Sequence, residues 1–278
     1  MPVSDMPIIQ FRQTIASNDA VRPFDLTDRG LLLGDGVFDT SLVKDGRMIL
    51  RERHIGRLVE ACDVFGHEVA KTEIEALAKD AVPEDATGAL RLTVTRGPGG
   101  RGLAETSASN PTLMASFTPM PLMYPSPPLC LGVSTIQRNP TAPSALYKTL
   151  SYGDAVMGQR QAQRNGYDDA LFLTSGGHIT CSSIANIWAW SGSTLVTPPR
   201  SDGVVVGVVR GWLLENAIRY GFEVSERSLR LDDIANADGV FLTNSLRLVV
   251  PVRAIDEMEF SPDLPSELES LISELLSS

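Results

Sequence analysis

Lysine, cysteine and histidine are scarce in this chain. Only four of its 278 residues are lysine, and cysteine and histidine contribute three residues each. The cysteines and histidines are widely spaced, so neither a disulfide framework nor a structural zinc site is expected. No apolar run approaches the roughly 20 residues that a membrane-spanning helix requires. The first residues, MPVSDMPIIQFRQ, lack the basic and then apolar segments of a secretory signal. These absences predict a cytoplasmic protein without a metal site or membrane contact.

Basic residues are also in the minority. The chain has 24 lysines and arginines against 34 aspartates and glutamates, a formal net charge of -10. Nucleic-acid binders normally carry a basic patch, so no nucleic-acid partner is expected. Hydrophobic residues make up 43% of the chain and charged residues 21%, as in ordinary globular proteins. A chain of this length buries a sizeable core in one large or two ordinary domains.

The first half of the chain alternates strand and helix patterns. GRMILRERHIGRLVEACDVFGHEVA predicts a short strand and then a helix that ends at Gly66. GALRLTVTRG predicts a half-buried strand with Leu90, Leu92 and Val94 on one face, and TLMASFTP predicts its partner. The glycine-rich loop between them is long for a hairpin, and long loops on rigid strands are often functional.

A proline-rich segment divides the chain. PMPLMYPSPP, at residues 119–128, contains five prolines and predicts an extended linker. The expected domains are therefore 1–118 and 129–278. In the second domain, strand patterns surround two predicted helices, one that ends at Gly166 and one at about 208–220. The fold class is thus α/β (α+β), in two domains.

One lysine lies in an unusual setting. Lys148, in SALYKTLSYGD, is surrounded by hydroxyls, aromatic rings and small residues, and no other basic residue occurs between Arg138 and Arg160. A lysine in an apolar site loses hydration, which makes the nucleophilic neutral amine accessible. Such lysines form Schiff bases with aldehyde cofactors and carbonyl substrates. The alternative is a lysine whose stem packs on a surface and whose ammonium reaches water.

Other segments of the chain suit an anion. SDGVVVGVVRGWLLENA brings glycines to the start of a helix, where backbone N–H groups and the helix dipole favour a phosphate. FLTNS offers the hydroxyls of Thr243 and Ser245 at the end of a strand, and Arg57 offers a permanent charge. Taken singly, each has an ordinary explanation as a helix cap, a turn or a solvated arginine.

In their order, these segments resemble one family, the class IV aminotransferase type of pyridoxal-phosphate enzymes. That family includes branched-chain and D-amino-acid transaminases and aminodeoxychorismate lyases. DRGLLLGDGVFDT resembles the amino-terminal signature, with Asp39 where glutamate is usual, and HIGRL resembles the segment whose arginine holds the cofactor phosphate. RGPGGRG is similar to the loop of the lyase branch, and KTLSYGDAVMGQRQAQRNGYDDALFL to the segment with the cofactor lysine. The resemblance covers about residues 24–255.

The resemblance implies a two-domain class IV pyridoxal-phosphate enzyme fold, a homodimer and the cofactor pyridoxal 5'-phosphate. Lys148 would hold the cofactor aldehyde and then act as acid and base on the substrate. The residues implied to contact the cofactor are Arg57, Tyr152, Cys181, Gly207, Val208, Thr243 and Ser245. The residues implied to contact the substrate are Arg101, Arg96 and Phe38.

Cys181 departs from the family pattern. The family has a glutamate five residues before the asparagine that here is Asn186, and that glutamate pairs with the pyridine nitrogen of the cofactor. A neutral thiol is only a weak hydrogen-bonding group, so the ring would be a poorer electron acceptor. Three explanations stay open: altered but real activity, a carboxylate from elsewhere such as Asp154 or Asp168, or a catalytically weak cofactor-binding homologue.

The sequence therefore predicts an enzyme that moves an amino group between an amino acid or amine and a 2-oxo acid. The alternative is an aminodeoxychorismate lyase-like enzyme that releases pyruvate, which RGPGGRG favours. A requirement for a 2-oxo acid acceptor separates the two.

Overall fold

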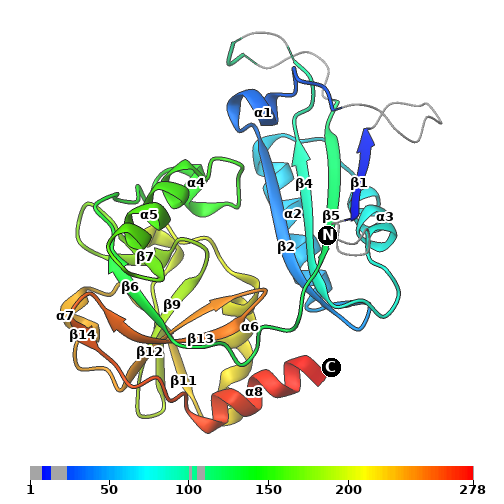
Figure 1. The fold of residues 1–278 in the computed structure, drawn as a ribbon. Helices are drawn as coiled ribbons and strands as arrows, with labels where there is room; N and C mark the ends of the chain where they lie inside the picture. Colours follow the sequence, from blue (N-terminus) through cyan, green and yellow to red (C-terminus); the bar gives the residue numbers. More distant parts are fainter. Residues whose placement is uncertain (1–7, 14–23, 100–101, 105–109, 278) are drawn as a thin grey trace. The chain divides into compact units, whose positions relative to one another are not determined.

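The computed structural model describes residues 8–13, 24–99, 102–104 and 110–277. They fall into two compact units (Figure 1). The first unit comprises the described part of Met1–Leu122 together with Lys148–Ser151, and the second comprises Met123–Tyr147 and Tyr152–Ser278. Each unit combines a sheet with helices, which confirms the predicted mixed fold class.

The first unit is built on an antiparallel sheet in the order β1-β5-β4-β2-β3. Its strands are β1 (Ile8–Gln13), β2 (Gly36–Lys44), β3 (Arg47–Met48), β4 (Gly88–Thr95) and β5 (Thr112–Pro119). Its helices are α1 (Arg29–Leu33), α2 (Arg51–Phe65) and α3 (Lys71–Ala81). Helices α2 and α3 pack against the sheet through their buried apolar residues. The predicted strand face is confirmed, because Leu90, Leu92 and Val94 are all buried.

Helix α2 follows the apolar pattern expected from the sequence. Ile55, Leu58 and Cys62 are buried at helical spacing. The helix ends at Gly66, as predicted, because the left-handed backbone of this residue (φ 67°) suits glycine and lets its N–H bond back to the carbonyl oxygens of the last turn.

The second unit is built on a larger sheet in the order β11-β10-β9-β12-β13-β6-β7-β8, and β14 pairs with β13. Its strands are β6 (Leu129–Val133), β7 (Asp169–Leu173), β8 (Ile179–Ser182), β9 (Asn186–Ser191), β10 (Thr194–Thr197), β11 (Glu223–Glu226), β12 (Gly239–Asn244), β13 (Leu248–Ile255) and β14 (Met258–Glu259). Strand β8 also pairs with β9 through Cys181 and Asn186, so this part of the sheet closes on itself. Apolar side chains of these strands form the core of the unit.

Helices flank this sheet. They are α4 (Pro143–Leu146), α5 (Gly153–Arg164), α6 (Val208–Asn216), α7 (Leu231–Ile234) and α8 (Ser266–Ser277), with 3-10 turns η2 (Arg200–Asp202) and η3 (Ala217–Tyr220). Helix α5 packs on β7, and a Cβ at Gly158 would lie 2.3 Å from the ring of Phe172. The helix predicted at about 208–220 is α6 followed by η3, so it changes to 3-10 geometry in its last turn.

The segment Lys148–Ser151 belongs to the first unit, although the chain on either side of it belongs to the second. It pairs with the start of β2: the N–H of Phe38 donates to the carbonyl oxygen of Lys148 (2.8 Å), and the N–H of Leu150 donates to that of Gly36 (2.9 Å). We expected the lysine in the second domain, and these backbone hydrogen bonds place it in the first unit instead. The predicted linker at 119–128 stays a prediction.

Within the described part of the chain, no helix is both long and apolar enough to cross a membrane.

Candidate active site

Lys148 lies in an extended segment between α4 and α5, and the pairing with β2 fixes its backbone. Its side chain is half-buried, and its Nζ lies 4.4 Å from the centre of the Phe38 ring. Phe38 is 5% exposed. The ring quadrupole attracts a cation placed over its face. The structure thus brings together two predicted site residues, Lys148 and Phe38.

Asp39, the next residue on β2, points to the opposite face of the sheet and joins a buried network. Its Oδ1 lies 2.6 Å from Nδ1 of His54, and its Oδ2 accepts a 2.7 Å hydrogen bond from Nε of Arg57. The side chains of Asp39 and His54 are each 2% exposed. His54 and Arg57 are three residues apart on α2 and therefore share a face of the helix. A buried carboxylate thus orients Arg57, the predicted phosphate ligand.

The charges in this network follow from its surroundings. Burial by itself would raise the pKa of Asp39, but the charge of Arg57 and hydrogen bonds from Arg57 and His54 outweigh it and hold that pKa well below its usual range. Burial lowers the pKa of His54 more than the Asp39 charge raises it. At neutral pH the imidazole is therefore neutral, and its Nδ1–H donates to the ionised Asp39.

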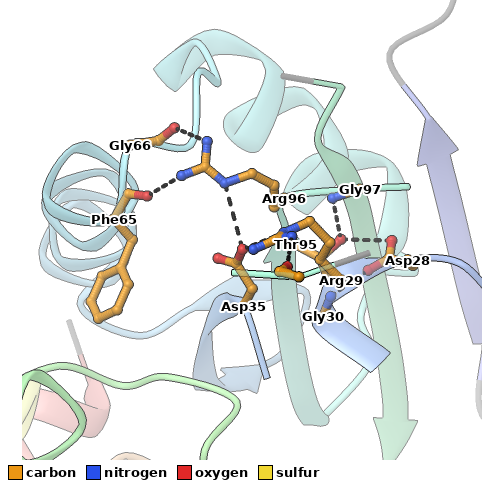
Figure 2. A network of polar contacts seen from close by, with 10 residues as sticks. Asp28, Arg29, Gly30, Asp35, Phe65, Gly66, Thr95, Arg96 and Gly97 are labelled. Atoms are coloured by element: carbon orange, nitrogen blue, oxygen red, sulfur yellow. Dashed lines mark hydrogen bonds and ion pairs between the residues drawn. The ribbon is translucent and has the colours of Figure 1, made fainter. Parts of the chain in front are cut away.

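Arg96 follows β4 and holds the end of α2 (Figure 2). Its Nη1 donates to the carbonyl oxygen of Gly66 (3.1 Å) and its Nη2 to that of Phe65 (2.9 Å). Its Nε lies 3.6 Å from Oδ2 of Asp35. The last carbonyl groups of a helix lack partners within the helix, so a cation there is stabilising. The structure gives Arg96 this structural role, and its predicted contact with the substrate stays a prediction.

Arg29 anchors the glycine-rich loop that follows Arg96. Its Nε donates to Oδ2 of Asp35 (2.9 Å, Figure 2), and its Nη1 donates to the carbonyl oxygen of Gly102 (2.9 Å). Arg29 is 6% exposed, so its own side chain is shielded from water. Arg101, the residue of this loop predicted to bind a carboxylate, lies outside the described residues and stays a prediction.

In the second unit, Gly207 and Val208 form the start of α6. Gly207 is the N-cap residue and has no side chain to occupy the first backbone N–H groups of the helix. A Cβ at Gly207 would lie 2.1 Å from Oδ1 of Asn186. The Nδ2 of Asn186 donates to the carbonyl oxygen of Val205 (2.9 Å), which fixes the chain leading into the helix. This helix start therefore keeps a glycine backbone and first N–H groups that have no partner within the helix, which suits a phosphate.

The two predicted hydroxyl donors lie at the end of β12, which contacts α6. Thr243 is 1% exposed, and its Oγ1 accepts a hydrogen bond from Nε1 of Trp188 (3.1 Å). Ser245 is half-buried and follows β12 in a turn in which Oδ1 of Asn244 accepts from the N–H of Leu246 (3.0 Å). Thr243 keeps the hydroxyl proton for another acceptor, because Trp188 uses only its oxygen.

Cys181 lies on β8, opposite Asn186 of β9. The Arg138 side chain forms a hydrogen bond with the thiol, and the hydroxyl of Thr180 lies 3.6 Å from its Sγ. Burial raises the pKa of the Cys181 thiol, and the charge of Arg138 offsets this only in part. At neutral pH the thiol is therefore protonated and neutral.

Three aspartates are candidates for a substitute carboxylate. Asp154, in the first turn of α5, and Asp168 are both exposed. Asp169 is 6% exposed, and burial raises its pKa although the hydroxyl of Ser183 donates to its Oδ1. The charge of Asp169 also acts to raise the pKa of Cys181. Of the three aspartates, only Asp169 is buried, and its carboxylate already accepts a hydrogen bond from the hydroxyl of Ser183.

Tyr152 is the N-cap residue of α5 and is half-buried. It is the first residue of the second unit after the segment Lys148–Ser151. Its predicted contact with the phenolic oxygen of the cofactor stays a prediction. Among the residues that the structure describes, no three histidine, cysteine or acidic side chains are grouped to hold a metal ion.

Comparison with known proteins assigns these features to a family. Residues 36–255 match the amino-transferase class IV family, which is more than half of the chain. The chain therefore belongs to the class IV aminotransferases, enzymes that depend on pyridoxal 5'-phosphate. The predicted family, enzyme class and cofactor are confirmed.

Individual relatives span the activities within the family. A Methanocaldococcus jannaschii protein assigned as a branched-chain-amino-acid aminotransferase is 31% identical over 238 residues, which cover 82% of this chain and 81% of the relative. The Bacillus subtilis aminodeoxychorismate lyase is 28% identical over 252 residues, 87% of this chain and 84% of the lyase. An aminotransferase structure from Mycobacterium tuberculosis in its pyridoxal-phosphate-bound form has a TM-score of 0.80 and 25% identity, and the match covers 94% of each chain.

Each unit, taken by itself, has residues whose chemistry suits the cofactor at predicted positions. In the first unit these are the Lys148 amine and Arg57, whose Nε is fixed by Asp39. In the second unit the start of α6 is closely packed, because a Cβ at Gly207 would collide with a neighbouring side chain. A neutral thiol at Cys181 cannot supply the negative charge of the glutamate that the family resemblance implies there.

Two residues that contact predicted or buried network residues were not predicted: His54, and Arg91, whose guanidinium carbon lies 3.6 Å from the centre of the Phe38 ring. His54 is within the quoted HIGRL segment, and its spacing of three residues from Arg57 was the available signal. Arg91 was recognisable only as a charged residue within the alternating strand GALRLTVTRG. The side chain of His54 contacts Asp39, and that of Arg91 contacts Phe38. A single sequence does not reveal such contacts.

Proposed function

We propose that this enzyme moves an amino group between an amino acid or amine and a 2-oxo acid, with Lys148 as the residue that holds the cofactor. The observation that carries this proposal is the setting of Lys148. Two backbone hydrogen bonds fix its segment to β2, and its Nζ lies over the Phe38 ring. A reactive amine must be held within hydrogen-bonding reach of the atoms it acts on, and a lysine on a strand-like segment is more restricted than one on a mobile loop.

Pyridoxal 5'-phosphate supplies an aldehyde carbon that binds amino groups and a ring that accepts electrons. Arg57 binds the phosphate through its permanent charge, and Asp39 fixes the direction of the guanidinium. The backbone N–H groups at Gly207 and Val208 and the hydroxyls of Thr243 and Ser245 complete the set of phosphate donors.

Lys148 moves the proton in the proposed reaction. With pyridoxal 5'-phosphate bound, its amine would take a proton from the substrate α-carbon, hold it and give it back, which is general acid–base catalysis by one group. Tyr152 is proposed to donate to the phenolic oxygen of the cofactor, and Arg101 to bind a substrate carboxylate.

Cys181 is proposed to face the pyridine nitrogen. Its raised pKa supports a neutral thiol there. A neutral thiol cannot hold the nitrogen in its charged form, so the ring withdraws electrons less strongly than with a carboxylate at this position. We therefore expect real but slow amino-group transfer.

The second candidate function is an aminodeoxychorismate lyase-like reaction. The RGPGGRG loop and the similarity to the Bacillus subtilis lyase favour it. This reaction releases pyruvate and an aromatic amine and needs no 2-oxo acid acceptor.

We further propose a homodimer that works in the cytoplasm without a nucleic-acid partner. The family resemblance and the acidic composition support this assembly and location.

The first prediction concerns the visible spectrum of the protein incubated with pyridoxal 5'-phosphate. The wild type should show a yellow band, and Lys148→Ala should lose this band and at least about 100-fold of the turnover. Lys79→Ala, which removes an exposed lysine on α3, is the matched control and should keep both.

Amino donors added without an acceptor then separate the candidate functions. Replacement of the band by the amine form of the cofactor supports aminotransfer, whereas pyruvate release from aminodeoxychorismate with an unchanged band supports the lyase. If Lys148→Ala keeps the band and the turnover of the wild type, the proposed function is wrong.

A further inference from the structure

Arg138 is a charged residue beside Cys181 in the second unit. Its backbone N–H donates to the carbonyl oxygen of Leu173 (2.8 Å), which ties the segment after β6 to the end of β7. Its guanidinium carbon lies 4.3 Å from the centre of the Phe172 ring, and that ring is fully buried. A cation is attracted to the face of an aromatic ring, so the backbone and the side chain of Arg138 are both held in place.

The described contacts of this guanidinium leave its positive charge unbalanced. They are the Phe172 ring and the Cys181 thiol, and neither is an anion, because the thiol is neutral at neutral pH. The Nε of Arg138 is buried and has no hydrogen-bond partner within the described residues. The carboxylate of Asp169 also acts on the thiol, with the opposite sign but more weakly than Arg138. The net influence of these two charges at Cys181 is therefore positive.

The direction of the hydrogen bonds at Cys181 follows from its neighbours. Arginine has N–H donors and no acceptor, so Arg138 donates and the sulfur accepts. The hydroxyl of Thr180 donates to the carbonyl oxygen of Phe172 (3.0 Å), so it has no second proton for the sulfur, which lies 3.6 Å away. The thiol proton is therefore available to an acceptor, either the hydroxyl oxygen of Thr180 or a ligand atom with a lone pair.

A thiol that can donate its proton suits a pyridine nitrogen that carries none. The unprotonated nitrogen has a lone pair and accepts a hydrogen bond, whereas the protonated nitrogen needs an acceptor. The sulfur already accepts from Arg138. A protonated nitrogen would also be a second cation close to this guanidinium, and like charges repel more strongly where burial reduces the screening by water. Hydrogen bonding and charge thus favour the same unprotonated state.

We propose that Arg138 is a positioning residue that acts through Cys181 and keeps the pyridine nitrogen of the cofactor unprotonated. The proposal rests on the proposed function, in which Cys181 faces this nitrogen, and adds the residue that sets the charge of the ring. A carboxylate at position 181 would offset the charge of Arg138, whereas the neutral thiol leaves it in place. Lys148 would then act on a substrate whose α-carbon gains less acidity from the cofactor ring.

Nitrogen-15 NMR of the enzyme loaded with ring-labelled pyridoxal 5'-phosphate tests this proposal, because the chemical shift of the nitrogen depends on its protonation. The wild type should show the unprotonated form at pH 7. Arg138→Met keeps a long side chain over Phe172 and removes its charge. It should raise the pH at which the nitrogen takes up its proton by about 1–2 pH units. Arg227→Met, which removes a side chain of the second unit that is 56% exposed, should titrate as the wild type does.

Two results of this titration overturn the proposal. One is a protonated nitrogen in the wild type at pH 7, and the other is an Arg138→Met variant that titrates as the wild type does. Cys181→Glu carries the test if Arg138→Met does not fold, as shown by circular dichroism. Its carboxylate offsets the charge of Arg138, so the nitrogen should be protonated at pH 7. An unprotonated nitrogen in Cys181→Glu at this pH also overturns the proposal.

The contact between Arg138 and the thiol can be measured without the cofactor. The charge of Arg138 acts to lower the pKa of Cys181, and the thiolate is the form that reacts with iodoacetamide. Arg138→Met should therefore slow the alkylation of Cys181 at a given pH by about 10-fold, followed by mass spectrometry of the peptide that contains it. Equal rates in this variant and the wild type overturn the proposal, because the charge of Arg138 would then not act on the thiol.

Failure of the proposed function gives a different result. In that case the wild type itself lacks the visible band that depends on Lys148, whereas failure of the Arg138 proposal leaves that band intact.

Discussion

At the scale of single residues, Asp39 contacts two side chains of α2 at once. It is one methylene shorter than the glutamate that the family resemblance leads one to expect here, yet its two oxygens bind His54 and Arg57 separately. Its depressed pKa means that the carboxylate stays ionised at any pH at which the enzyme would work. A neutral His54 adds a hydrogen bond to Asp39 without adding a positive charge. The negative charge of Asp39 therefore pairs with the positive charge of Arg57.

Asp39→Asn should separate the charge of this residue from its shape. The amide has nearly the same size but no charge, so Arg57 loses its ionic partner and its fixed direction. We expect the Kd for pyridoxal 5'-phosphate to rise by about 10-fold to 100-fold, measured by absorbance titration at a temperature where the variant is folded. Asp45→Asn, at a 69% exposed side chain in the turn after β2, should leave the Kd unchanged. Equal Kd values for Asp39→Asn and wild type would show that Asp39 does not orient the phosphate ligand.

At the scale of elements, the sequence revealed local structure and missed distant pairing. Strands β4 and β5 and helix α2 were predictable because their apolar periodicity and their terminating glycine lie within one short window. The pairing of Lys148 with β2 was not, because it joins residues more than 100 positions apart. The role of Arg96 was hidden for the same reason, since its partners Phe65 and Gly66 are about 30 residues away. Motif resemblance located the candidate site residues, and only the fold revealed that Arg96 also bonds to the end of α2.

The start of α6 offers a test at this scale. Gly207→Ala places a methyl group 2.1 Å from Oδ1 of Asn186, so that either the asparagine or the first turn of α6 must move. We expect a loss of about 1–3 kcal/mol in the free energy of unfolding and weaker binding of pyridoxal 5'-phosphate, both followed by thermal unfolding with and without the cofactor.

Gly56→Ala is the matched control for this substitution. It lies in the exposed interior of α2 with nothing within 4 Å of the new methyl group, and it should stabilise the chain by up to about 1 kcal/mol. If Gly207→Ala behaves like Gly56→Ala, close packing at the start of α6 does not matter for the site.

At the scale of the whole molecule, acid stability depends on buried histidines. His67 is 2% exposed, and its ring nitrogens have no hydrogen-bond partner within the described structure. Burial lowers its pKa to about 4 from an ordinary value of 6.5. Below pH 6.5 His67 binds a proton in the unfolded chain but stays neutral in the folded chain. The free energy of unfolding therefore falls as the pH falls towards 4.

His67→Leu should reduce this loss. Between pH 7 and pH 4 the variant should lose less stability than the wild type, by at most about 3 kcal/mol, in urea unfolding at a series of pH values. His178→Gln, at a partly exposed histidine in the second unit, should follow the wild type. Parallel curves for His67→Leu and wild type would show that His67 does not set the acid limit.

The path of the chain through its two units constrains how such a protein can be recombined. The lysine segment is paired with a strand from the first third of the chain, while its flanking residues on both sides belong to the other unit. A hybrid that joins the first 122 residues of this chain to the remainder of a relative would therefore import a foreign lysine segment onto a native β2. Such a hybrid would fold correctly only if the foreign lysine segment forms the same backbone hydrogen bonds with Gly36 and Phe38. Strand β2 and the lysine segment should therefore be taken from the same parent protein, although they are far apart in the sequence.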